Sequence, residues 1–416
     1  MPSRGKRLQW VAFACAAIFL PSVSAAQLPA VRAVDLTASD GVALKASYFA
    51  AAKPGPGVLL LHQGNRDRTA WSELAGRLAA AGIHALTVDM RGFGESGGTP
   101  HDQLPPREEY RIRQEVWPGD IDAAWTYLVS QPGVRGKVIG IGGAGWDGVD
   151  AAVQTARRHR GAVKSLVLLS GETFLPGLRF LHEASEVPEL FAVADDDEYP
   201  PTEAAMELLY SLASSPGKRW VHYAGPKVPW LGLEDVPGVA ATGRHGTDLF
   251  ETHPALPGLI ADWYVATLIR TPGRAPKDRA SAVPCAPILA RLKQPGGVAA
   301  IARLLAAARQ RDPAAQLFPE TPASILGNDY LRAGETKAAL ALLKLVATAY
   351  PDSADANDSL SDAYLADGQT APARHYAEQA LHLLSSDDED SPALRELIRN
   401  SAEKKLQRLA KAEPSR

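Results

Sequence analysis

The sequence of 416 residues contains only two cysteines, Cys15 and Cys285, which excludes a small fold held together by disulfides. It also lacks a basic excess, because 44 Lys and Arg residues stand against 47 Asp and Glu residues, and this excludes the charge pattern of a nucleic-acid-binding protein. With 46% hydrophobic and 22% charged residues, the composition is that of a globular protein. The length exceeds that of one ordinary domain, so we expect two or more folding units.

The N-terminal segment has the pattern of an export signal. Basic residues at positions 4–7 precede an apolar run over 8–20, and small residues follow at 24–26. The apolar run falls short of the roughly 20 residues that a membrane-spanning helix needs. We therefore predict a signal peptide over 1–26, a mature chain without a membrane span, and a periplasmic or secreted location. Cleavage would change the formal net charge from −3 to −6, because the segment holds three basic residues and no acidic ones.

Three regions follow the signal. Residues 27–270 alternate short β-rich runs with helical stretches, which predicts an α/β domain with a mostly parallel sheet. Residues 271–296 are rich in proline and predict a linker. Residues 297–416 carry only helical patterns.

The helical region repeats itself at a shift of 34 residues. The repeated pairs are Leu326/Leu360, Tyr330/Tyr364, Leu331/Leu365, Gly334/Gly368 and Ala339/Ala373. A glycine between two helices and this period resemble the tetratricopeptide repeat. About three such units are usually needed for independent stability, so we expect these repeats to pack against the α/β domain and to depend on it for stability.

Two segments of the α/β domain together resemble the α/β-hydrolase superfamily, in its dienelactone-hydrolase and esterase-like branch. LLLHQGNRDRTAW (59–71) is similar to the loop that supplies part of the oxyanion hole, which implies pocket positions for His62 and Gln63. VDMRGFGESGG (88–98) matches the next strand and its Arg-Gly-x-Gly-x-Ser turn. The resemblance implies an α/β-hydrolase fold with helices on both faces of the sheet. Residues 101–117 replace a simple turn and are expected to cover the site.

A third segment, VIGIGGAGWDGVDAA (138–152), lies where this family places its nucleophile elbow, G-x-S-x-G. Counting from Gly143 puts the nucleophile position on Gly145, and counting back from Gly148 puts it on Trp146. The whole segment contains no Ser, Thr or Cys. We take Gly145 as the nucleophile position and Trp146 as a pocket residue.

Asp147 is the alternative nucleophile, because the related haloalkane dehalogenases and epoxide hydrolases use Asp at the elbow. The position two residues later would then be Val149, whose branched side chain suits a tight turn poorly. We favour a role for Asp147 in capping the helix that follows.

The remaining two members of a catalytic triad have candidates. ELFAVADDDEYPP resembles the strand after which the family's acid lies, and the spacing favours Asp197 over Asp195 and Asp196. ATGRHGTDLFETHP resembles the histidine loop, which implies His245 as the general base. Three adjacent aspartates are costly unless water, a metal or another cation lies close to them.

Three interpretations of function follow, in order of preference. The first is an exported protein of hydrolase lineage that keeps the Asp-His pair and binds an ester- or acyl-like small molecule with little or no turnover. The second is an active hydrolase that uses Asp147 or a water activated by His245. The third is a repeat-based scaffold, whose repeats bind a protein or peptide partner. We predict no cofactor, no metal and no nucleic-acid partner.

Overall fold

A computed structural model describes residues 31–197, 201–225, 244–274, 283, 285–385 and 392–412. The signal peptide predicted over 1–26 lies outside these described residues. No helix within them combines the length and the apolar character needed to cross a membrane.

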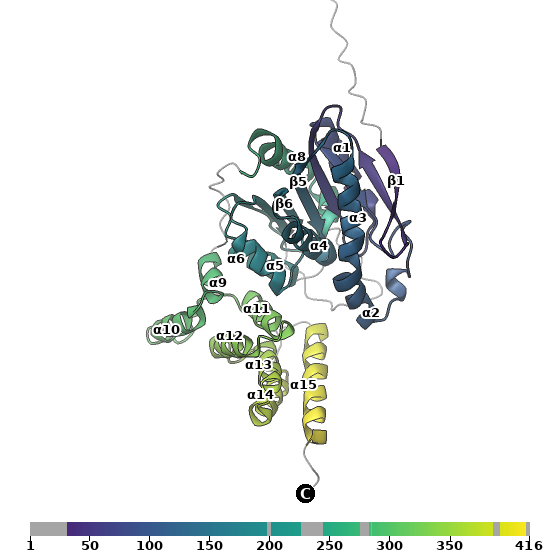
Figure 1. Cartoon of the computed structure of the whole chain (residues 1–416). Helices are drawn as coiled ribbons and strands as arrows, with labels where there is room; N and C mark the ends of the chain where they lie inside the picture. Colours follow the sequence, from purple (N-terminus) through teal and green to yellow (C-terminus); the bar gives the residue numbers. More distant parts are fainter. Residues whose placement is uncertain are drawn as a thin grey trace, which may run out of the picture.

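An eight-stranded sheet forms the centre of the α/β unit (Figure 1). Its strands are β1 (Val31–Thr37), β2 (Ala43–Phe49), β3 (Gly55–Leu61), β4 (His84–Val88), β5 (Val134–Ala144), β6 (Val163–Leu169), β7 (Glu189–Ala194) and β8 (Lys218–Tyr223). They lie in the order β1-β2-β4-β3-β5-β6-β7-β8. β2 pairs antiparallel with β1 and β4, and every other pairing is parallel. The carboxyl ends of the parallel strands therefore meet at one edge, where ligand sites of such sheets form.

Helices cover both faces of this sheet because its central strands are apolar on both sides. In β3, Val58 and Leu60 pack into one buried cluster and Leu59 and Leu61 into another. The first face is covered by α1 (Ser72–Ala80) and α8 (Leu256–Tyr264). The second is covered by α3 (Trp117–Ser130), α4 (Gly145–Arg158), α5 (Leu175–Glu183) and α6 (Pro201–Leu212). This architecture confirms the predicted α/β-hydrolase fold.

Short helical segments interrupt the connections around the sheet. They are η1 (Arg68–Trp71), η2 (His101–Gln103), α2 (Pro106–Arg111), the π-helical η3 (Ile112–Val116), η4 (Gly246–Asp248), α7 (Leu249–Thr252) and the π-helical η5 (Val265–Arg270). Three of them, η2, α2 and η3, form one excursion between β4 and α3. This excursion is the segment 101–117 that was expected to cover the site.

An all-helical region follows, as predicted over 297–416, and its first helix lies inside the segment 271–296 that was predicted to be a linker. Its helices are α9 (Ala286–Leu292), α10 (Gly297–Arg309), α11 (Glu320–Arg332), α12 (Thr336–Ala349), α13 (Ala354–Ala366), α14 (Thr370–Leu383) and α15 (Pro392–Ala412). In Figure 1 they lie at one end of the α/β unit, where α11 packs against α5 and α6. One continuous buried cluster runs from the sheet through α9 into α12, so the two regions share a hydrophobic core.

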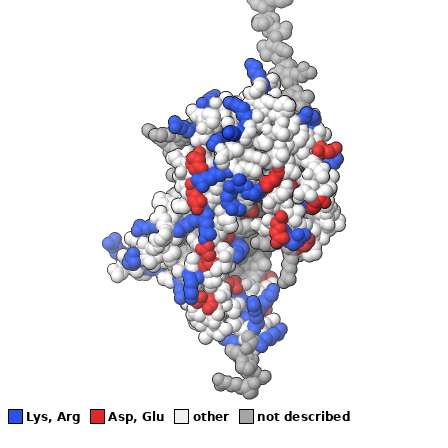
Figure 2. All heavy atoms as spheres, viewed as in Figure 1, with Lys and Arg blue, Asp and Glu red and all other residues white. Residues whose placement is uncertain are grey.

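The surface charge is mixed. On the face seen in Figure 2, Lys and Arg side chains gather near the middle with Asp and Glu side chains beside them. Surface ion pairs such as Arg160 with Glu186, at 2.7 Å, contribute only about 0–1 kcal/mol each. The stability of the fold therefore rests on its shared core.

Candidate active site

The candidate general base and acid lie against each other. His245 stands directly before η4, and Asp197 lies in the turn after β7. The ring Nδ1 is 3.0 Å from Asp197 Oδ1 and 3.2 Å from Oδ2, and the two side chains are 7% and 1% exposed. Because the carboxylate can only accept when ionised, Nδ1 carries the hydrogen and donates it. In the neutral ring this leaves the lone pair on Nε2, the arrangement that a general base requires.

Each of the three consecutive aspartates faces a different partner. Asp195 contacts His222, Asp196 forms an ion pair with Arg244, and Asp197 contacts His245. The structure thus brings the favoured residue of the three to the histidine. The other two are directed elsewhere by the turn that follows β7.

Gly145 occupies the elbow between β5 and α4. Its φ of +65° lies in the left-handed region, which costs a residue with a side chain about 1–2 kcal/mol. A Cβ built on Gly145 would lie 3.1 Å from His245 Nε2. Gly143 and Gly148 make the turn tight, since a Cβ on Gly143 would overlap the Gly148 carbonyl oxygen. The position that faces the base is therefore Gly145, which offers no side chain to activate.

Trp146 does not take that position. Its indole Nε1 donates a hydrogen bond to Thr202 Oγ1 at 3.0 Å, and its side chain lines a neighbouring cavity. Of the two registers considered for the elbow, the structure therefore supports the one counted from Gly143.

The side chain of Gln63 fills the space in front of Gly145. A Cβ on Gly145 would come well inside contact distance of Gln63 Cβ and within 3.2 Å of its Cα. The Gln63 amide is buried, donates from Nε2 to the His245 carbonyl at 3.0 Å and accepts at Oε1 from Thr247 N at 2.7 Å. Gln63 thus braces the histidine loop and occupies the volume that a nucleophile would need. The sequence pointed only to its backbone, and no pattern indicated this role of the side chain.

His62, the other residue of this loop that was predicted to lie in the pocket, supports the backbone instead. It is buried, accepts at Nε2 from Met90 N at 2.9 Å and donates from Nδ1 to the Gln63 carbonyl at 2.8 Å. Burial lowers the pKa of this imidazole, so it stays neutral. His62 therefore ties the loop after β3 to the loop after β4.

Asp147 is placed away from the base. Its Oδ1 forms a 2.8 Å ion pair with Arg113 of η3, and its Oδ2 lies against Gly64. The side chain is 8% exposed, and burial raises the pKa of the carboxyl group. The N-cap residue of α4 is Ala144, and Asp147 lies inside the first turn, so the expected capping role is replaced by the pair with Arg113.

A cavity of about 260 Å³ opens beside the elbow. The π-helical η3 supplies Arg113, α3 supplies Trp117, α4 supplies Trp146, and the loop after β6 supplies Glu172 and Phe174. Its walls combine three aromatic side chains with six charged ones, so the cavity offers both apolar surface and polar groups to a small molecule.

Glu172 is a cavity residue that no sequence pattern indicated. Burial raises the pKa of its carboxyl group to about 7, against the opposing effect of Arg332 on α11. Arg332 also lies over the ring of Phe174, with 5.1 Å from its guanidinium carbon to the ring centroid. The helical region thus reaches one wall of this cavity.

No protein-family model matches the chain, and no curated protein sequence matches it. Among solved structures, the chain is similar to an esterase from Pyrococcus furiosus, with 14% identity and a TM-score of 0.43 over 57% of this chain and 93% of the other. It is also similar to a dienelactone hydrolase from Anabaena variabilis, with 20% identity and a TM-score of 0.40 over 57% of this chain and 98% of the other. An α/β hydrolase from a Penicillium species shows 17% identity and a TM-score of 0.38 over 48% and 91%. The strand order and the placement of the helices identify the fold independently of these likenesses.

Proposed function

We propose that this protein belongs to the ester- and acyl-hydrolase lineage, has lost its nucleophile, and binds an ester- or acyl-like small molecule with little or no turnover. The geometry at Gly145 carries the proposal. The position facing His245 Nε2 has no side chain, and Gln63 fills the space where one would lie. Loss of the serine from such a triad costs about 10⁶ in turnover in a well-studied protease. The Asp197–His245 pair remains ordered but has no hydroxyl or thiol to deprotonate at this position.

The cavity beside the elbow supports the binding half of the proposal. Trp117, Trp146 and Phe174 offer an apolar surface for an acyl chain or aromatic ring. Arg113 offers hydrogen-bond donors for a carbonyl or carboxylate oxygen, since it lines the same cavity. The volume of about 260 Å³ lies just below the usual range for ligand pockets, so we expect a small ligand.

Ester hydrolysis tests the catalytic half. The wild type and His245→Ala, purified in parallel, should hydrolyse a short-chain aryl ester at the same background rate. An ordinary enzymatic rate of about 1–10³ per second in the wild type that is lost in His245→Ala would contradict the proposal. In that case, loss of activity in Asp147→Asn as well, with an ester trapped on Asp147, would support the covalent alternative. Activity retained in Asp147→Asn would support a water activated by His245.

Tryptophan fluorescence tests the binding half. Addition of a short-chain acyl ester or its carboxylate should change the emission of the wild type, because Trp117 and Trp146 line the cavity. Trp146→Phe should weaken the response and the affinity. The matched control is Trp125→Phe, because Trp125 stacks on His159 with 4.1 Å between ring centroids and does not line this cavity. An equal loss in both variants, or no saturable response in the wild type, would contradict binding in this cavity.

We also propose that α11 to α14 form two tetratricopeptide-like repeats that bind a protein or peptide partner. Two observations support this. The helices α11 (Glu320–Arg332) and α12 (Thr336–Ala349) begin and end 34 residues before α13 (Ala354–Ala366) and α14 (Thr370–Leu383), and both turns use a left-handed glycine, with φ 75° at Gly334 and 77° at Gly368. Cross-links from a bound partner should map to these helices, and cross-links confined to the α/β unit would contradict the proposal.

Export is the last part of the proposal, and the N-terminal pattern supports it. Mature protein recovered from a secreting host should begin at Gln27. Full-length protein that retains Met1 and is found only in the cytoplasm of that host would contradict export.

A further inference from the structure

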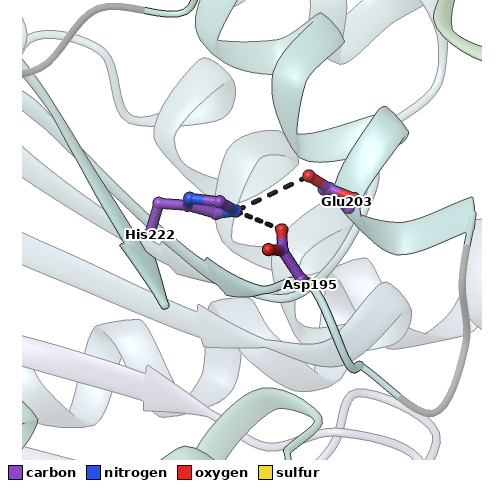
Figure 3. A group of neighbouring side chains, drawn as sticks. All are labelled: Asp195, Glu203 and His222. Atoms are coloured by element: carbon purple, nitrogen blue, oxygen red, sulfur yellow. Dashed lines mark hydrogen bonds and ion pairs between the residues drawn. The ribbon is translucent and has the colours of Figure 1, made fainter. Parts of the chain in front are cut away.

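A second cluster of titratable side chains lies beside β7 and the edge strand β8 (Figure 3). Asp195 follows β7, His222 lies on β8, and Glu203 lies in the first turn of α6. One ligand atom from each of the three lies within 4.8 Å of the others. The imidazole Nε2 is 2.5 Å from Asp195 Oδ1 and 3.5 Å from Glu203 Oε1, so both carboxylates converge on one ring nitrogen.

From this geometry we propose that Asp195, Glu203 and His222 bind a divalent transition-metal ion, Zn²⁺ in the first place. The site is independent of the function proposed above, because it takes none of its residues from the elbow or the cavity. Three protein ligands leave one position of a tetrahedral zinc ion for water or a ligand, as in open zinc sites.

The charges of the three side chains favour a cation. Two carboxylates share one imidazole, and like charges that share a site are costly unless a positive charge lies between them. The adjacent positive charge of Arg244 is directed to Asp196, with which it forms an ion pair. A metal ion would take the place of the hydrogen bond between His222 Nε2 and Asp195 Oδ1.

The distances allow such an ion with small movements. Metal bonds of about 2.0–2.2 Å place tetrahedral ligand atoms roughly 3.3–3.6 Å apart. The contact between His222 and Glu203, at 3.5 Å, already fits, whereas His222 and Asp195, at 2.5 Å, must separate by about 1 Å. The side chains of Asp195, Glu203 and His222 are 17%, 21% and 34% exposed, so an ion can reach them from solvent.

Neighbouring groups orient two of the three ligands. The backbone N–H of Gly225 donates to Asp195 Oδ2 at 3.3 Å, which leaves Oδ1 directed at the imidazole. The ring of Trp220 stacks near that of His222, with centroids 6.1 Å apart and planes 20° apart. A hydrogen bond such as that from Gly225 to Asp195 is the kind of outer contact that holds a metal ligand in position.

The donor set selects the class of metal. Mg²⁺ and Ca²⁺ prefer sites built from oxygen alone, whereas an imidazole nitrogen suits Zn²⁺ and its neighbours in the first transition row. Zn²⁺ should therefore bind more tightly than Mg²⁺ or Ca²⁺.

Isothermal titration of the tag-free, chelator-treated full chain tests the site. We expect one Zn²⁺ per chain, with affinity at least 10-fold weaker in Asp195→Asn, Glu203→Gln and His222→Ala, and no comparable binding of Mg²⁺ or Ca²⁺. Thermal unfolding of each metal-free variant shows whether it is folded. Zn²⁺ should raise the Tm of the wild type and leave the Tm of the three variants unchanged.

Two control variants separate this site from general binding. Asp122→Asn alters another surface Asp-His contact, in which Asp122 Oδ1 lies 3.1 Å from His159 Nε2, and it should leave the Zn²⁺ affinity unchanged. Cys285→Ser removes the half-buried free thiol and should also leave it unchanged. The proposal is overturned by the lack of stoichiometric Zn²⁺ binding, by full affinity in folded variants of the cluster, or by an equal loss in either control.

Discussion

The substitution Gly145→Ser probes the relation between the elbow and Gln63. Two costs are expected. The left-handed φ of +65° should cost about 1–2 kcal/mol for any residue with a Cβ. Crowding against Gln63 should add about 1–3 kcal/mol, the usual cost of overpacking a well-filled interior. The free energy of unfolding should therefore fall by about 2–5 kcal/mol, a large part of the 5–15 kcal/mol of an ordinary domain.

A matched variant separates the two costs. Gly82 also has a positive φ, 90°, but a Cβ built on it meets nothing within 4 Å. Gly82→Ser should therefore show the backbone cost alone, about 1–2 kcal/mol. The loss of unfolded-chain freedom on replacing glycine is the same in both variants and cancels in their difference. Urea unfolding of the two variants measures the crowding at the elbow directly.

Replacing Gln63 by glycine should relieve the crowding. Gln63→Gly alone is expected to destabilise the chain, because it removes the hydrogen bonds to the His245 carbonyl and to Thr247. The added cost of Gly145→Ser should then be smaller in the Gln63→Gly background than in the wild type. If Gly145→Ser costs no more than Gly82→Ser, or if the two substitutions at the elbow are additive, the described contact is refuted.

Two other predictions concern buried charged side chains. Burial raises the pKa of Glu172 to about 7 and that of Asp329 to about 6, while unfolded carboxyl groups titrate near about 4, so between these values the folded chain holds more protons than the unfolded chain. The free energy of unfolding should therefore fall as the pH rises from about 4.5 to 7. Urea unfolding at pH 5 and pH 8 should show a smaller fall in Glu172→Gln than in the wild type, and an equal fall in both would contradict the burial of this group. Lys405 is buried on α15, and its Nζ lies 2.8 Å from Asp358 Oδ1 on α13. Lys405→Ala should therefore weaken the packing of α15 against α13 by about 3–5 kcal/mol and speed the hydrogen exchange of α15. The control Lys404→Ala, at an exposed neighbouring position, should do neither.

The sheet could be predicted because its signal is local. Apolar runs such as that of β3, which is buried on both sides, already imply a parallel sheet covered on both faces, and the structure has it. The placement of His245 beside Asp197 followed from the order of segments in a resembling family. Both inferences need only short stretches of sequence and their order along the chain.

The side-chain contacts that the sequence did not predict join residues that are distant along the chain. Gln63 is 184 residues from Thr247, and nothing in either segment indicates that their side chains meet. Arg113 on η3 meets Asp147 on α4, and His222 on β8 meets Asp195 after β7, only when elements distant in sequence come together in the fold. Periodicity describes which side of an element is buried, but it carries no information on which polar partner lies opposite.

We propose that Gly145 takes the nucleophile position and that the wild type has no nucleophile there. Intact-protein mass spectrometry after treatment with a fluorophosphonate tests it most directly. The wild type should gain no adduct, and the double variant Gln63→Gly with Gly145→Ser should gain one at position 145 that disappears when His245→Ala is added. A stoichiometric adduct on the wild type that depends on His245 would contradict the account.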